Sequence, residues 1–147
     1  MTDHSLYMQQ ALEQARQAKD DGELPFGAVV VHDGKVIAAG RCRETKQKTV
    51  LAHAELQAVD AACRALGTNK LSDCTIYCTN EPCPMCAAAI FQAKISDVVI
   101  GASRGDSSFL RPRTIGIAEL ANDSGYDIRI TRDVMKQDVL RLFSDEV

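Results

Sequence analysis

The chain has 147 residues, of which 46% are hydrophobic and 25% are charged, with 17 basic residues against 20 acidic ones. This length and composition exclude a fibrous or disordered chain and predict one globular domain over residues 1–147, with a core that needs no disulfide staples. The net charge of −3 gives no general electrostatic attraction to nucleic acid and leaves room only for a local basic patch.

The sequence shows neither the basic and apolar start of a secretory signal nor an apolar run near the ~20 residues of a membrane span. We therefore expect a cytoplasmic protein with reduced thiols and no membrane contact. Clustered cysteines in that compartment more often bind metal or take part in chemistry than form disulfides. For this reason the even count of 6 cysteines is not interpreted as a set of disulfide pairs.

Hydrophobic periodicity, turn dipeptides and β-branched runs define the expected elements. In chain order these are a helix over 3–19, a hairpin of strands 27–32 and 35–39 around Asp33-Gly34, a mobile polar loop over 41–49, a helix over 52–66, a strand over 74–79, a helix over 84–94, a strand over 97–101, a loop over 105–113, a weak helix over 115–121, a strand over 127–131 and a closing helix over 133–143. A hairpin followed by helical crossovers predicts a mixed five-stranded sheet with parallel later strands. The expected fold class is α/β, a three-layer α/β/α sandwich.

Two segments at predicted helix starts carry the candidate chemistry. Cys83 and Cys86 form a C-x-x-C, which places both sulfurs on one side of a first helical turn, where they can share a metal ion. His53 and Glu55 open the other helix. One histidine and two thiolates predict a Zn²⁺ site whose fourth position stays open for water, the arrangement of a catalytic zinc. Glu55 is then predicted to accept the proton of that water as a general base.

The combination H-x-E with P-C-x-x-C is the zinc-deaminase signature. Over about residues 24–101 the chain resembles the cytidine-deaminase-like superfamily, in the branch of guanine, cytosine and tRNA adenosine deaminases. The runs that carry the resemblance are Pro25–Val31, Ala52–Glu55 and Glu81–Ile90. Within them, Pro25–Ala28 together with Glu81–Cys86 looks most like the guanine deaminase subgroup. The resemblance implies one catalytic Zn²⁺, a heteroaromatic amine as substrate and a homodimer.

The resemblance also implies substrate contacts. The backbone around Ala54 and Glu81 is expected to contact the base, and Phe26 to pack against its ring, with plain core packing as the alternative for Phe26. Phe109 lies where the family has elements that cover the substrate, although an aromatic residue at such spacing is also a core candidate. Cys42 stands where family members carry an asparagine that hydrogen-bonds the ring. A thiol is a weak donor and acceptor, so either the substrate presents a different edge or the alignment is shifted here.

Three functions follow as hypotheses. The first is hydrolytic deamination of a free base such as guanine, or a ring of the cytosine or isocytosine type. The second is a tRNA adenosine deaminase, which the pI of about 5.6 disfavours. Four basic residues would then form a local patch, or else a solvated loop: Arg41, Arg43, Lys46 and Lys48. The third is a non-catalytic protein in which zinc only stabilises the fold, held by four protein ligands. The remaining cysteines are candidates for the fourth ligand, although they are more simply explained as core residues: Cys63, Cys74 and Cys78.

Overall fold

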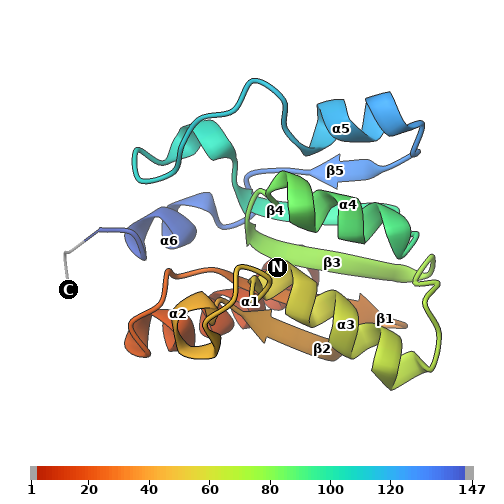
Figure 1. Cartoon of the computed structure of the whole chain (residues 1–147), viewed down its shortest axis with the longest axis horizontal. Coiled ribbons are helices and arrows are strands. Elements are labelled where there is room, and N and C mark those ends of the chain that lie inside the picture. The colour runs from red at the N-terminus through yellow and green to blue at the C-terminus, as the bar shows by residue number, and fades with distance from the viewer. Residues whose placement is uncertain (1–2, 145–147) are drawn as a thin grey trace.

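The computed structural model describes residues 3–144. The elements in chain order are α1 Asp3–Asp20, β1 Gly27–His32, β2 Lys35–Arg41, α2 Glu44–Gln47, α3 Ala54–Leu66, β3 Cys74–Asn80, α4 Pro84–Gln92, β4 Asp97–Ala102, the 3-10 turn η1 Arg104–Asp106, α5 Ile117–Ser124, β5 Arg129–Thr131 and α6 Lys136–Arg141 (Figure 1). None of the helices within this described range is long and apolar enough to cross a membrane.

The five strands form one mixed sheet in the order β2-β1-β3-β4-β5. Strand β1 pairs antiparallel with both β2 and β3, whereas the β3–β4 and β4–β5 pairs are parallel. Asp33 and Gly34, with φ of 53° and 75°, supply the two left-handed residues that a tight hairpin turn needs. The predicted hairpin, sheet composition and fold class are confirmed.

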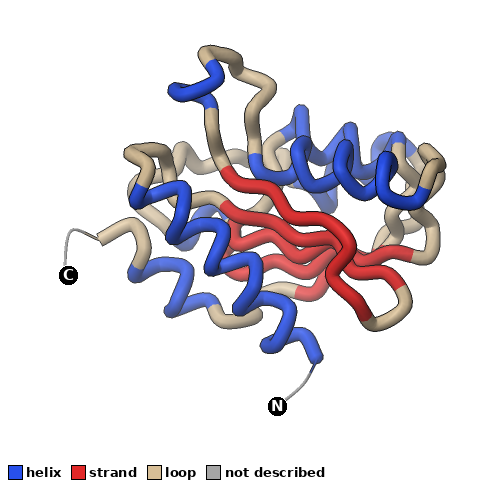
Figure 2. Tube along the Cα trace, turned by 90° about the horizontal axis from the view of Figure 1, so that it is seen from below, coloured by secondary structure: helices blue, strands red, loops and turns tan. Residues whose placement is uncertain are grey.

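Helices cover both faces of the sheet (Figure 2). On one face α1 and α6 bury Leu12 and Val139 against the strands. On the other face α3, α4 and α5 bury Ala58, Ile90 and Ile117 in a second cluster. The chain therefore has the three layers that the pattern predicts, and α3 and α4 lie in the same layer, so that their first turns can meet.

Close packing sets the position of α3. A Cβ atom on Gly40 of β2 would lie 2.2 Å from the carbonyl oxygen of Ala54 and 2.7 Å from the amide nitrogen of Ala58. Only glycine permits this approach, so the start of α3 lies directly on the backbone of β2. Since His53 and Glu55 are at that helix start, the glycine also fixes their height above the sheet.

Most predicted boundaries differ from the observed ones by one or two residues, and the larger differences have identifiable causes. The stretch 41–49 contains the short helix α2, because the Glu23 carboxylate accepts hydrogen bonds from the backbone N–H groups of Thr45 and Lys46 at 3.0 and 2.8 Å. The closing helix begins only at residue 136, because Asp133 and Met135 have φ of 66° and 57°, which interrupts a helix.

Candidate active site and metal centre

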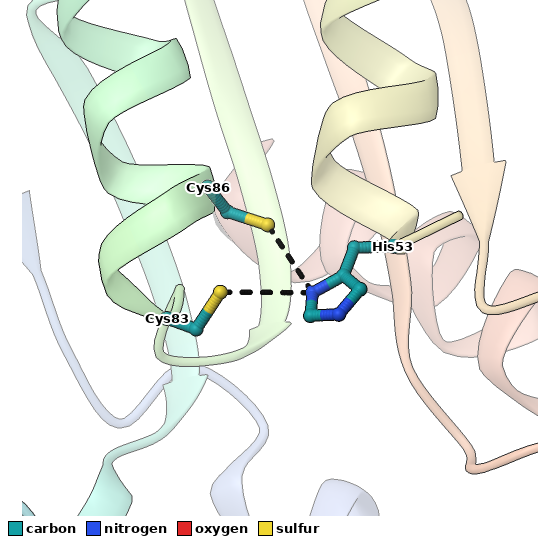
Figure 3. A group of neighbouring side chains, drawn as sticks. All are labelled: His53, Cys83 and Cys86. Atoms are coloured by element: carbon teal, nitrogen blue, oxygen red, sulfur yellow. Dashed lines mark hydrogen bonds between the residues drawn. The ribbon is translucent and has the colours of Figure 1, made fainter. Parts of the chain in front are cut away.

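The first turns of α3 and α4 bring together the three predicted metal ligands (Figure 3). His53 caps the N-terminus of α3 and Cys83 that of α4, both with extended backbone, and Cys86 lies one turn into α4. The Nδ1 atom of His53 lies 3.6 Å from Sγ of Cys83 and 3.4 Å from Sγ of Cys86. All three side chains thus point to one spot.

The spacing of these donor atoms fits a zinc ion. With Zn–S near 2.3 Å and Zn–N near 2.0 Å, tetrahedral geometry separates a nitrogen from a sulfur ligand by about 3.5 Å. The observed distances of 3.4 and 3.6 Å agree with this value. Two sulfurs and one imidazole nitrogen are ligands that Zn²⁺ favours, and the cluster contains these three described side chains alone, as an open site requires.

The thiols of the two cysteines differ in pKa. A hydrogen bond from the thiol of Cys86 to the sulfur of Cys83 lowers the pKa of Cys83 to about 5. The same contact, together with burial, raises the pKa of Cys86. One sulfur therefore already carries the thiolate form that a metal ligand needs, at a helix N-terminus that favours negative charge.

Glu55 is the buried carboxylate of the site. Its side chain is on the first turn of α3, and the residue is only 7% exposed. Burial raises the pKa of Glu55 to about 7, a shift that the nearby Cys83 reinforces. A carboxyl group with such a pKa can both accept and donate a proton near neutral pH, which is the requirement for a general acid–base group.

The far side of the His53 ring also has a partner. Its Nε2 atom pairs with the carboxylate of Glu44, from α2. A carboxylate on the outer nitrogen fixes the tautomer of a ligating histidine and raises its basicity. Because Glu23 caps α2, it also holds the helix that carries Glu44.

A cavity of about 60 Å³ lies beside the cluster. It is lined by Phe26, His53, Ala54, Glu55, Asn80, Glu81, Cys83, Arg104 and Leu110. The predicted contact residues Phe26, Ala54 and Glu81 are thus in the lining. Neither Cys42 nor Phe109 is among the described residues that line it.

Cys42 and Phe109 instead lie close to lining residues. The amide nitrogen of Cys42 donates to the carbonyl oxygen of Phe26 at 3.1 Å, and burial raises the pKa of the Cys42 thiol. Phe109 is 66% exposed, and its ring stacks 6.2 Å from that of Phe143, which in turn lies 5.6 Å from the Phe26 ring. The three phenylalanines form a row from the cavity wall to the surface.

Glu81 has a structural role that its sequence position does not reveal. Its carboxylate accepts hydrogen bonds from Arg132 Nη1 at 2.8 Å and from the backbone N–H groups of Arg104 and Ile117 at 3.3 and 3.2 Å. Burial opposes ionisation, but these contacts hold the pKa of Glu81 below its usual value. The side chain thereby joins η1, α5 and the end of β5 to the cavity wall.

Sequence reasoning missed three lining residues and one supporting residue: Asn80, Arg104, Leu110 and Glu44. Of these, only Asn80 could have been suspected from the sequence, because it is a polar residue that ends a β-branched strand and directly precedes the Glu81-Pro82-Cys83 run. All six cysteines are free in the structure, and Cys74 and Cys78 are buried core residues as predicted.

Comparisons with known proteins agree with this arrangement. The tRNA-specific adenosine deaminase of Bacillus subtilis (strain 168) is 48% identical over 103 residues, which are 69% of this chain and 63% of that protein. The guanine deaminase of the same organism is 39% identical over 106 residues, 71% of this chain and 68% of that protein. The chain thus spans less than two thirds of the length of the first of these relatives.

A solved structure from studies of A-to-I editing by tRNA:A34 deaminases at the wobble position of transfer RNA has a TM-score of 0.81 and 32% identity. It covers 93% of this chain and 98% of its own chain. The family model for the MafB19-like deaminase matches residues 2–139. These similarities confirm the resemblance to cytidine-deaminase-like proteins, and the chain belongs to the MafB19-like deaminase family.

Proposed function

We propose that the chain is a zinc-dependent hydrolytic deaminase that acts on the amino group of a purine, with adenosine in tRNA as its first candidate substrate. The observation that carries the proposal is the convergence of His53, Cys83 and Cys86 beside the buried carboxylate of Glu55 in one cavity. A purely structural zinc site has no use for such a carboxylate.

Each residue of the site has a distinct role in the proposed reaction. His53, Cys83 and Cys86 would hold Zn²⁺, which when bound supplies a Lewis acid that lowers the pKa of water toward ~7. Glu55 accepts a proton from the attacking water and delivers it to the ring nitrogen beside the amino-bearing carbon. The Glu55 carboxylate then takes the second proton of that water from the hydroxyl group now attached to the carbon and gives it to the amino group. The carbon–nitrogen bond breaks, ammonia leaves and the carbon–oxygen double bond of the keto base forms.

Two observations support tRNA over the free base that the sequence pattern favoured. The relatives described above include a tRNA-specific adenosine deaminase at the higher identity. In addition, the loop after the lining residue Leu110 exposes Arg111 and Arg113, which follow the exposed Phe109 by two and four residues in the chain. An aromatic face with neighbouring guanidinium groups suits a flanking nucleotide and its phosphates.

A free purine base of the guanine type is the second candidate. Asp21 pairs with two of the four basic residues of the 41–49 stretch, Arg41 and Lys46, at 3.8 Å each. This reduces the positive charge available to phosphates on that side of the molecule. The guanine deaminase relative supports the same candidate.

A panel of substrates distinguishes adenosine in tRNA from a free purine base. Zinc-loaded protein would be incubated with an anticodon stem-loop RNA containing wobble adenosine, with adenosine, and with free adenine, guanine and cytosine, while ammonia is measured. We expect ammonia and inosine from the RNA. Ammonia from guanine alone would establish the second candidate, and ammonia from none of them would refute the proposed activity.

The resemblance also implies a homodimer, and we include that state in the proposal. Val50 and Leu51, just before His53, are 72% and 60% exposed, and a second copy of the chain would cover this apolar surface. Light scattering should give twice the chain mass of 16.0 kDa. A particle of single mass at micromolar concentration would contradict the dimer.

A further inference from the structure

We propose that Asn80 is a specificity-determining residue whose side-chain N–H donates to a hydrogen-bond acceptor on the purine ring. The inference rests on the proposed function and adds to it the chemical character of the ring edge that the site recognises. Asn80 is the last residue of β3 and lines the cavity together with Glu55.

A short chain of hydrogen bonds fixes which way the Asn80 amide is oriented. The backbone N–H of Gly27 donates to Thr79 Oγ1 at 3.1 Å, and the Thr79 hydroxyl donates to Oδ1 of Asn80 at 2.9 Å. The Thr79 hydroxyl thus accepts from Gly27 through a lone pair and gives its single proton to the Asn80 oxygen. The oxygen of the amide is thereby occupied, and its NH₂ group is the free end.

That free end has no protein partner. Asn80 is only 4% exposed, and its Nδ2 is buried without a hydrogen-bond acceptor among the described residues. Buried donors are nearly always satisfied, because leaving one unpaired loses the hydrogen bonds that water would have made. An unpaired donor in the wall of a substrate cavity is therefore explained by an acceptor that the substrate supplies.

A second hydrogen-bond donor without a partner among the described residues belongs to Arg104. Nε of Arg104 is also buried without a partner among the described residues, and Arg104 lines the same cavity. The Glu81 carboxylate next to them is already occupied by Arg132 and two backbone N–H groups. The wall at the end of β3 thus offers donors, and it selects a ring edge with an unprotonated nitrogen or a carbonyl oxygen.

This assignment also accounts for Cys42. Position 42 carries a cysteine in place of the asparagine that the resemblance implies, and Cys42 is buried, bonded through its backbone to Phe26 and outside the cavity lining. An amide is nevertheless present in the wall at position 80, at the end of β3, with β1 between that strand and β2. We infer that the ring-reading amide is carried by β3 in this chain rather than by the segment after β2.

A cycle of enzyme and substrate changes tests the assignment. Adenine rings in which one ring nitrogen is replaced by C–H, the 3-deaza and 7-deaza forms, would be supplied in whichever context the wild type deaminates. We expect one of the two to lower kcat/KM of the wild type by about 10- to 100-fold, because it leaves the Asn80 donor unpaired. In Asn80→Leu the same replacement should have no effect, since the donor is gone.

The controls keep the result interpretable. Asn69→Leu changes an exposed asparagine outside the cavity and should retain the wild-type penalty. Thermal melting and zinc content report whether Asn80→Leu folds. If it does not fold, Asn80→Asp is used in its place, because aspartate keeps the size of the side chain but removes the N–H donor. The assignment is wrong if neither deaza ring is penalised in the wild type, or if the penalty persists in the Asn80 variants. A wild type that deaminates no purine would instead refute the proposed function, and calorimetric binding of purine and its two deaza forms would then test Asn80 by the same comparison.

Discussion

Glu55 concentrates the proposed chemistry in a single side chain. Replacing it by glutamine keeps the shape but removes the proton-carrying group, so Glu55→Gln should lose about 100- to 10,000-fold in the rate of ammonia release. Zinc content should remain at the wild-type level, because the ligand atoms are unchanged. Ammonia release near the wild-type rate would remove Glu55 from the mechanism.

Cys83 tests the ligand set. Cys83→Ala removes one of three donor atoms and should leave the purified protein without stoichiometric zinc in metal analysis. Cys63→Ala is the matched control, since Cys63 is a half-buried cysteine on α3 outside the cluster. Full zinc occupancy in Cys83→Ala would mean that the ion is held elsewhere.

Glu44 is a positioning residue, because it acts through His53. Glu44→Gln replaces the charged partner of Nε2 by an amide and should weaken zinc binding about 10- to 100-fold in a competition with a chelator. Glu13→Gln, on the exposed part of α1, should leave the zinc affinity unchanged. Equal affinities in the two variants would show that the Glu44 contact does not support the ligand.

At the scale of the elements, the site depends on how closely α3 lies against β2. Gly40→Ala would insert a Cβ within 2.2 Å of the Ala54 carbonyl oxygen, so α3 must move away from the sheet. We expect a loss of about 1–3 kcal/mol in the free energy of unfolding, measured in urea, as for other over-packed positions. Gly105→Ala meets nothing within 4 Å and should be nearly neutral. Equal stability of both variants would contradict the tight contact.

The helix α2 depends on one carboxylate. Burial opposes ionisation of Glu23, but hydrogen bonds from Lys46 and Thr45 hold the pKa of Glu23 below its ordinary 4.5. The charged form is therefore favoured in the folded state, and its stabilising effect is complete above pH 4.5 and lost as pH falls through the lowered pKa.

Glu23→Gln should consequently be less stable than the wild type at pH 7, and the difference should shrink as the pH drops below 4.5. Urea unfolding of both proteins between pH 7 and pH 3 measures this directly. A difference that stays constant over the whole range would show that the charge of Glu23 does not hold α2.

Elements with local patterns were predictable, and those set by distant contacts were not. The hairpin and α3 follow from turn dipeptides and helical spacing near residues 33 and 54. In contrast, α2 forms because Glu23, far away in sequence, caps it. The late start of α6 follows from the left-handed backbone at Met135, which no side-chain periodicity reveals.

At the scale of the whole molecule, the fold explains why the motif residues meet. Because α3 and α4 cover the same face of the sheet, two helix starts that are separated in sequence present His53 and Cys83 to each other. The sequence motif predicted that His53 and Cys83 lie close together, because each of them stands at a recognisable helix start. It could not predict Asn80 or Arg104 in the cavity wall, because an isolated polar residue at a strand end or in a turn has no characteristic spacing.

The proposed site hydrolyses a carbon–nitrogen bond with water activated next to Glu55. The most direct measurement is mass spectrometry of the product formed in water labelled with heavy oxygen, with ammonia measured in the same reaction. We predict one labelled oxygen in the keto base for each ammonia released by the wild type, and formation of both products about 100- to 10,000-fold more slowly by Glu55→Gln. Unlabelled keto base, or labelled base formed by Glu55→Gln at the wild-type rate, would contradict the proposed hydrolysis through Glu55.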